Sequence, residues 1–105
     1  MSASHVFAHR VDVDGVYHRE VRLEDDGGLT IIGHDVGSGA MGGAEYEFER
    51  RIDPAQLRRF VAAIEVPGDP REVLELLAAE FASSVELELR LETEGVATTF
   101  WSRVG

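Results

Sequence analysis

The chain of 105 residues contains no cysteine, no lysine and no asparagine. Without cysteine, the fold has neither disulfides nor thiolate-bound metal to hold it together. A chain of this length can bury about two thirds of the surface that its unfolded form exposes, which is enough for one hydrophobic core. We therefore expect residues 1–105 to form a single domain. Lysine and asparagine both use AT-rich codons, so their absence indicates a GC-rich genome rather than a special site.

Basic residues are also scarce. The chain has 10 of them and 20 acidic residues, which gives a net charge of −10. Binding to nucleic acid depends largely on neutralising phosphates, and anionic lipid attracts proteins in the same way, so both partners are disfavoured. No apolar run approaches the length of a membrane span, and residues 1–15 lack the features of a signal peptide. We expect a cytoplasmic protein with no nucleic-acid partner and no membrane contact.

Apolar residues recur at every second position through the first half of the chain, which is the period of β-strands. The first turn falls at residues 13–15. A three-residue loop there, with Gly15 in the left-handed region and a bulge beside it, would bring Phe7 and Tyr17 onto one face of the sheet. A two-residue turn would place them on opposite faces.

The second turn, at residues 25–27, repeats this pattern. A three-residue loop there would pair Leu23 with Leu29 and keep the apolar side chains on one face. Both turns thus favour a three-residue loop. The sequence therefore predicts an antiparallel meander of four strands before the helices begin.

Two segments of the second half carry signals for the start of a helix. Asp53 precedes a proline at the first helical position, and apolar residues then follow with helical spacing as far as Ile64. Asp69 and Pro70 repeat this pattern of a capping residue and a proline before a second series of apolar residues. We expect two helices, starting at Pro54 and at Pro70.

The stretch SSVELELRLETEG can be interpreted in two ways, because its apolar residues alternate as in a strand while leucine, glutamate and arginine favour helices. Ser83 and Glu86 form a capping-box pattern and Gly95 stands where a C-cap glycine belongs, so we favour a short helix. A hairpin turning at Glu94 and Gly95 is the alternative. With a last strand over 96–102, the chain is an α+β domain: a mostly antiparallel sheet of about five strands in the order ββββααβ, a possible third helix, and helices packed on one face.

Three segments resemble a group of small acidic proteins from high-GC actinobacteria. They are EDDGGLTIIGHDVG (24–37), EYEFE (45–49) and LETEGVATTFWSRVG (91–105). In this group a Gly-His/Gln-Asp-Leu-Gly stretch precedes an aromatic, acidic strand, and a helix ending in a Glu-x-Gly turn leads to a Phe-Trp-Ser strand. The resemblance implies a helix over 84–94 and no particular activity. The glycines of 37–43 depart from the group, which usually carries an acidic, aromatic segment there.

The glycine-rich stretch at residues 37–43 contains GSGAMG, which matches the G-x-G-x-x-G pattern of phosphate-binding loops. That pattern requires a helix directly after the glycines, whereas a strand is predicted here. The surrounding chain also lacks a βαβ unit. We therefore expect a plain loop and no cofactor.

Histidine and acidic side chains raise the question of a metal site. His5 and His9 lie about 13 Å apart along one strand, at roughly 3.3 Å per residue, and cannot share an ion. His34 and Asp35, together with Glu45 or Glu47 of the next strand, could form a mixed site for zinc or iron. The simpler interpretation is that Asp35 satisfies backbone amides of the glycine loop, so we expect no bound metal.

The candidates for catalysis are His34, Asp35 and Ser38. Adjacent side chains of an extended chain point to opposite faces, which leaves hydrogen-bond contact among them poor. We therefore expect no enzyme. The alternative is a small enzyme or ligand-binding domain whose pocket opens beside residues 37–43.

Three polar side chains fall on the predicted apolar face of the strands: His9, Arg19 and Arg50. We expect the first two at the edge of the sheet. A charged Arg50 on the inner face needs a carboxylate partner, and Asp35 and Asp12 are the candidates.

Glu45, Glu47 and Glu49 alternate along one predicted strand and point to one face at spacings of about 7 Å. An acidic ridge of this kind attracts a basic partner over long range. Tyr46 and Trp101 are the candidate anchors, because aromatic side chains carry much of the energy of interfaces. We expect a non-catalytic protein-binding domain, an immunity-like or inhibitor protein, that presents an acidic face to a basic protein partner.

Overall fold

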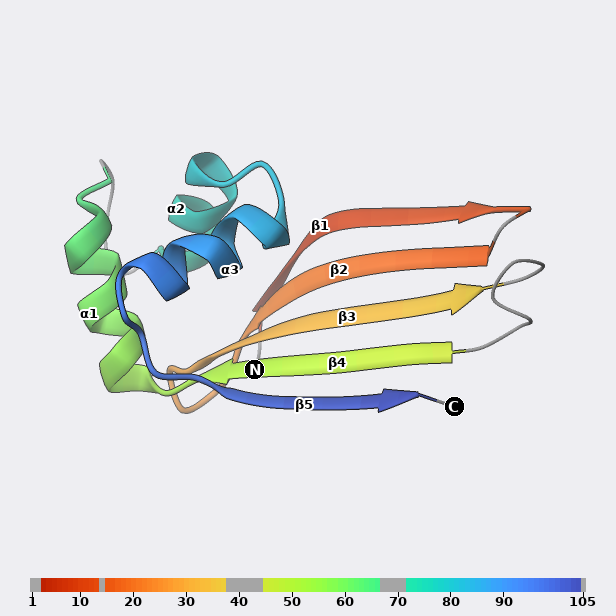
Figure 1. Ribbon diagram of the computed structural model, residues 1–105. Coiled ribbons are helices and arrows are strands. Elements are labelled where there is room, and N and C mark those ends of the chain that lie inside the picture. The colour runs from red at the N-terminus through yellow and green to blue at the C-terminus, as the bar shows by residue number, and fades with distance from the viewer. Residues whose placement is uncertain (1–2, 14, 38–44, 67–71, 105) are drawn as a thin grey trace.

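The computed structural model describes residues 3–13, 15–37, 45–66 and 72–104, and within them the chain forms five strands and three helices in the order ββββαααβ (Figure 1). The strands are β1 (Ala3–Asp12), β2 (Gly15–Leu23), β3 (Leu29–Gly37), β4 (Glu45–Ile52) and β5 (Thr99–Val104). The helices are α1 (Pro54–Ile64), α2 (Val73–Glu80) and α3 (Ser84–Thr93). None of these described helices has the length and apolar character needed to cross a membrane. The predicted α+β class is confirmed.

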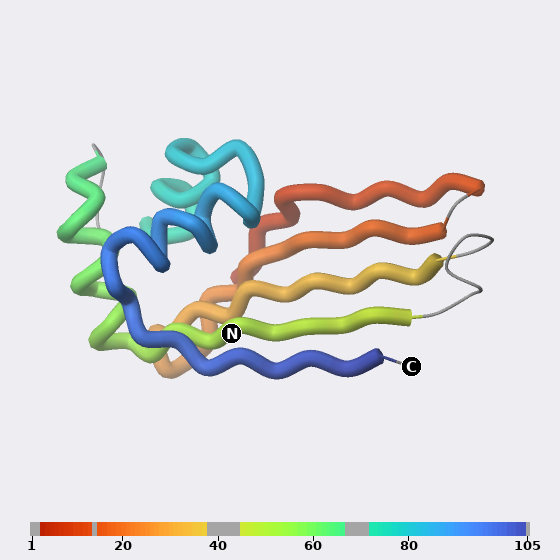
Figure 2. Tube along the Cα trace, in the orientation of Figure 1, coloured from red at the N-terminus to blue at the C-terminus, as the bar shows by residue number. Residues whose placement is uncertain are grey.

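All five strands belong to one antiparallel sheet in the order β1-β2-β3-β4-β5. The predicted meander is therefore confirmed. After the three helices, the chain returns so that β5 lies beside β4 at the edge of the sheet (Figure 2). β5 begins at Thr99 rather than at Val96, because Val96 packs against the core before the strand starts.

The turn between β2 and β3 has the predicted register. Leu23 pairs with Leu29, and the Glu24 amide donates a hydrogen bond to the Gly28 carbonyl at 2.8 Å. Gly27 has a φ of 90°, in the left-handed region that glycine adopts without strain. The three-residue loop expected at residues 25–27 is present.

The hairpin of β1 and β2 has a different register from the predicted one. Asp12 pairs with Gly15, and Val11 pairs with Val16. A three-residue loop would instead have paired Val11 with Tyr17. The prediction was wrong by one residue, which reverses the faces of the side chains next to the turn.

A bulge at Phe7 compensates for this register, since the pairing shifts between Val6 and Ala8. It returns the beginning of β1 to the alternation that packs Phe7 against the core. Between the bulge and the turn, side chains lie on the face opposite to the predicted one. His9 therefore does not share a face with Arg19. His9 lies on an edge strand as expected but on the other face, whereas Arg19 keeps its predicted face and lies on the interior strand β2, not at the edge.

α1 and α3 begin at their predicted caps. The Asp53 carboxylate accepts a hydrogen bond from the Gln56 amide at 2.8 Å, and the Ser83 hydroxyl accepts one from the Glu86 amide at 3.2 Å. Gly95, with a φ of 68°, follows the end of α3. The helical interpretation of the stretch SSVELELRLETEG is therefore confirmed. The capping signals at both ends and the burial of one side of the helix outweigh the alternation of the leucines.

α2 begins at Val73, after Glu72, which is not helical. The predicted cap Asp69 and the predicted first helical residue Pro70 lie outside the described residues. The helix buries Leu76 and Leu77 in the core. Its apolar spacing, which predicted Leu76 and Leu77 on the buried side, is confirmed.

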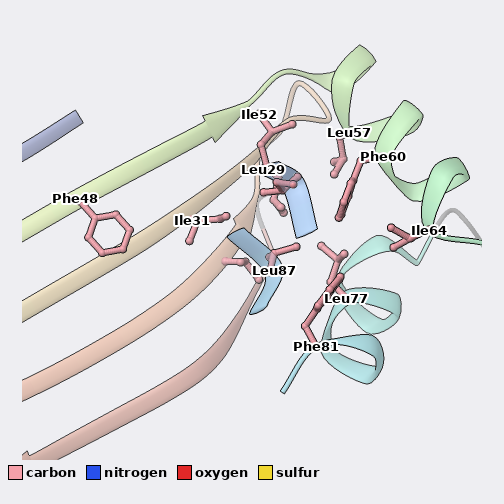
Figure 3. Packing of buried hydrophobic residues seen from close by; sticks show 12 residues of the cluster. Leu29, Ile31, Phe48, Ile52, Leu57, Phe60, Ile64, Leu77, Phe81 and Leu87 are labelled. Carbon is pink, nitrogen blue, oxygen red and sulfur yellow. The ribbon is translucent and has the colours of Figure 1, made fainter. Parts of the chain in front are cut away.

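One hydrophobic core joins the three helices to one end of the sheet (Figure 3). The strands contribute Val21, Leu29, Ile31, Phe48 and Ile52, the helices contribute Leu57, Phe60, Ile64, Leu77, Leu87 and Leu91, and Phe81 joins them after α2. Phe60 stacks on Phe81, with ring centroids 6.3 Å apart. Truncation of such a buried phenylalanine to alanine costs about 3–5 kcal/mol. The strands extend well beyond the helices, which cover only part of one face (Figure 1).

Arg50 connects this face of the sheet to α3. Its Nε donates to Glu88 Oε1 at 3.1 Å, and its Nη1 donates to the Thr98 hydroxyl at 2.9 Å. The carboxylate partner is thus a helix residue that the strand pattern did not indicate. The predicted partner Asp35 pairs instead with Arg19.

Candidate binding face of the sheet

The helices pack on one face of the sheet, and no described helix packs on the other, which we call the open face. Val21, Ile31 and Ile52 point toward the helices, so their neighbours along each strand point away from them. At its centre the open face carries His9, His18, Glu20, Ile32, His34, Glu45, Glu47, Glu49, Trp101 and Arg103.

A polar row crosses all five strands of the open face. Its members stand directly opposite one another in the order His9, His18, His34, Glu47 and Arg103. Opposite residues of an antiparallel pair have Cβ atoms about 4.5–5.5 Å apart, which is close enough for their side chains to interact. The register of the sheet, rather than nearness in sequence, creates this row.

The first part of the row is a histidine pair. The Nδ1 atoms of His9 and His18 lie 2.9 Å apart, and His18 Nε2 lies 2.9 Å from Glu20 Oε1. A carboxylate only accepts, so His18 Nε2 carries the proton, and in the neutral ring its Nδ1 accepts from His9. Sequence reasoning missed this pair, because it compared His5 with His9 along one strand and the contact depends on the register of β1.

The second part of the row places His34 between two carboxylates of β4. Its Nε2 lies 2.9 Å from Glu45 Oε1 and 3.7 Å from Glu47 Oε1. The hydrogen bond with His34, followed by one with Glu47, lowers the pKa of Glu45, because both favour the charged carboxylate. Arg103 donates to Glu47 Oε1 at 3.2 Å. Three of the four residues considered for a mixed metal site thus meet, and Asp35 does not join them.

The three glutamates of the predicted ridge all project from the open face, but their surroundings differ. Glu45 contacts His34 and Glu47 contacts Arg103, so part of their charge is neutralised within the molecule. Glu49 is exposed and forms no ion pair with another described residue. The ridge therefore presents its charge to solvent most freely at Glu49.

The two candidate aromatic anchors lie on opposite faces. Trp101 stands opposite Glu49 on the open face and is 49% exposed. A hollow of about 240 Å³ lies beside it. Tyr46 belongs to the helix-side alternation, where its ring lies 6.0 Å from that of Phe48 and it packs against the core. Trp101 can therefore act together with the ridge, and Tyr46 cannot.

The residues of the alternative pocket do not form one group in the part of the chain that the structure describes. His34 is on the open face, whereas Asp35 points to the helix side and accepts hydrogen bonds from Arg19 at 2.7 and 3.1 Å. Burial lowers the pKa of Arg19, but the hydrogen bond and charge of Asp35 outweigh burial and leave that pKa raised. Ser38 and the glycine loop that follows Gly37 lie outside the described residues.

The open face thus offers two kinds of contact. Trp101 and Ile32 provide apolar area, while the polar row provides hydrogen-bonding and charged groups that a protein or a cation could engage. The resemblance to small acidic actinobacterial proteins stays a prediction. Comparisons of the chain with protein-family models, curated proteins and solved structures gave no match.

Proposed function

We propose that the chain is a non-catalytic protein-binding domain that holds its partner on the open face. The observation that carries this proposal is a sheet face without a described helix on it, from which apolar side chains project. Val6, Val11 and Trp101 are 48%, 69% and 49% exposed. Val6 and Val11 lie on β1 and Trp101 lies on β5, at opposite edges of the sheet, so they offer separate apolar contacts rather than one patch. Of these residue types, tryptophan is enriched at protein interfaces.

Trp101 is the proposed anchor of the interface. Tryptophan is among the residue types whose truncation costs interfaces the most, and the hollow beside Trp101 offers space for a partner side chain. Glu49 stands opposite it on β4, and no described cation neutralises it. An arginine or lysine of the partner could therefore pair with Glu49 beside the anchor.

A basic protein is the proposed partner. The chain carries a net charge of −10, and a field of this sign accelerates the encounter with a positively charged surface. The attraction is screened over about 8 Å at physiological ionic strength, so the association rate should fall as salt rises. Small acidic immunity and inhibitor proteins bind their targets in this manner, and we assign the chain to this functional class.

The second candidate is a small enzyme or ligand-binding domain with a pocket near residues 37–43. A hollow of about 370 Å³ that adjoins Gly37 favours it. Of the two carboxylates in its described lining, Asp12 and Asp35, the second is already paired with Arg19. Its described lining includes no serine, threonine, cysteine or histidine, so it lacks the usual nucleophiles. The geometry therefore favours the binding domain.

Affinity capture with the whole chain from its source organism, followed by mass spectrometry, tests the proposal. The expected partner is a basic protein, and its affinity is then measured with purified variants. Trp101→Ala should weaken binding by about 2 kcal/mol, roughly 30-fold. Phe100→Ala is the matched control, because Phe100 is 51% exposed and projects from the other face. We expect it to change the affinity by less than about threefold.

A second pair of variants tests the charge. Glu49→Arg should weaken binding, whereas Glu92→Arg makes the same change in net charge at an exposed position of α3 and should leave the affinity nearly unchanged. Equal weakening by both members of either pair would contradict the assignment of the open face. Capture of no basic protein would contradict the proposed partner class.

A further inference from the structure

We propose that His34, Glu45 and Glu47 bind one divalent transition-metal ion, for which Zn²⁺ is the test case. Their ligand atoms all lie within 4.8 Å of one another, and in the described residues they are the only group of three histidine or acidic side chains that meets this limit. The site goes beyond the proposed protein binding and does not depend on it.

The spacing of the ligand atoms suits a tetrahedral ion. His34 Nε2 lies 2.9 Å from Glu45 Oε1 and 3.7 Å from Glu47 Oε1. Bonds of about 2.0–2.2 Å from zinc to nitrogen and oxygen place the ligands of a tetrahedral site roughly 3.3–3.6 Å apart. The observed distances lie on either side of this range, so small side-chain rotations suffice to bring the three atoms around an ion.

The backbone holds the ligands in position before any ion binds. His34 pairs directly with Glu47, and Val36 pairs with Glu45, across two strands that each have a neighbour on both sides. Ligands carried by rigid interior strands need no rearrangement of the chain. Arg103 of β5 donates to Glu47 at 3.2 Å and would serve as an outer partner, since carboxylate ligands are commonly hydrogen-bonded in this way.

The chemistry of the three side chains favours a cation between them. A neutral His34 has one proton to donate from Nε2, so it can form a good hydrogen bond with only one of the two carboxylates. A metal ion can bind both carboxylates and accept the imidazole lone pair. The side chains of His34, Glu45 and Glu47 are 38%, 42% and 29% exposed, so water can complete the coordination. Imidazole combined with carboxylate suits zinc, manganese or iron better than calcium or magnesium, which take oxygen ligands.

The neighbouring pair His9 and His18 is the competing location for an ion. Their Nδ1 atoms lie 2.9 Å apart, but they are joined in a mutual hydrogen bond, and the second nitrogen of His18 is held by Glu20. An ion there would have two nitrogen ligands, against the three ligand atoms that His34, Glu45 and Glu47 offer. The three-ligand group is therefore the better site, and the variants must separate the two.

Titration of the untagged protein with zinc chloride tests the proposal. Isothermal calorimetry at pH 7 in a non-coordinating buffer should show one Zn²⁺ per chain. His34→Gln and Glu47→Gln should each weaken this binding at least tenfold, because even the loss of an outer partner costs about 10–100-fold. Glu49→Gln is the matched control, since it removes the same charge from the same strand and face without touching the site. It should alter the affinity by less than about twofold.

Several outcomes would overturn the metal site. They are a lack of binding up to millimolar zinc, equal weakening by Glu49→Gln, and weakening by His9→Gln but not by His34→Gln. His34→Gln and Glu47→Gln change partly exposed side chains, so circular dichroism of the metal-free variants will verify folding and a lost affinity will report a lost ligand. The titration needs no protein partner, so its failure would leave the proposed protein binding untouched.

Discussion

Gly33 lies on the helix side of β3, directly opposite Phe48 of β4, and its substitution by alanine tests the packing of the sheet. A Cβ added at Gly33 would lie 2.0 Å from Phe48 Cε1 and 2.5 Å from Phe48 Cζ. Carbon atoms in ordinary contact are about 3.5–4.0 Å apart, so the ring would have to move by about 1.5 Å or more. Gly33→Ala therefore has a steric cost that the strand pattern alone does not show.

The neighbours of Phe48 oppose that movement. Phe48 is only 8% exposed, its ring stacks on Phe100 with centroids 5.8 Å apart, and the Arg19 guanidinium lies 5.2 Å from its centroid. Arg19 is itself held by Asp35. Overpacking of this kind costs about 1–3 kcal/mol, against a gain of roughly 0.5–1 kcal/mol when glycine is replaced within a strand. We expect Gly33→Ala to lower the free energy of unfolding by about 1–2 kcal/mol.

Urea unfolding, followed by circular dichroism, measures this change, which should appear as a lower midpoint with an unchanged slope. The melting temperature should fall by about 4–8 °C for each kcal/mol. Phe48→Leu removes the ring, so Gly33→Ala should cost less in that background, and the double-mutant cycle gives the coupling. A stabilising effect of Gly33→Ala in the wild-type chain, or the same cost in both backgrounds, would refute the steric explanation.

Two further predictions concern a helix cap and a carboxylate. Ser83→Ala should lower the free energy of unfolding by about 1 kcal/mol, because it removes the cap of α3, whereas Ser102→Ala on exposed β5 should have little effect in the same urea experiment. In metal-free buffer, NMR titration should place the pKa of Glu45 below its ordinary value of 4.5, and His34→Gln should raise it. Since this pKa is lowered, the stabilisation from the pair is present above pH 4.5 and is lost as the pH falls through the pKa of the folded state. A Glu45 titration that His34→Gln leaves unchanged would contradict the hydrogen bond as the cause.

Local signals predicted many of the elements correctly. Asp53 and Ser83 cap the helices that their sequences indicate, and the loop at residues 25–27 sets the register between β2 and β3. These features depend on residues within a few positions of one another, so they can be recognised without knowledge of the rest of the fold. The alternation of β4 likewise placed Glu45, Glu47 and Glu49 on one face.

Contacts between distant segments could not be predicted in this way. The pairing of Asp12 with Gly15 places His9 on the open face, and the bulge at Phe7 returns the beginning of β1 to the core. Arg50 finds its carboxylate on α3, in Glu88, which is 38 residues away in the sequence. Neither has a local signal, because both depend on how complete strands and helices come to lie side by side.

By itself, the sequence determined where most strands and helices form and which side chains of β2, β3 and β4 share a face, since periodicity and capping are properties of neighbouring residues. The tertiary structure alone decided which face stays without a described helix and which side chains meet on it. His34 lies between Glu45 and Glu47, and Trp101 lies opposite Glu49, only because the strands pair in this register. A shift of one residue in any pair would move every side chain of that strand to the other face, so the candidate site depends on the register of the whole sheet.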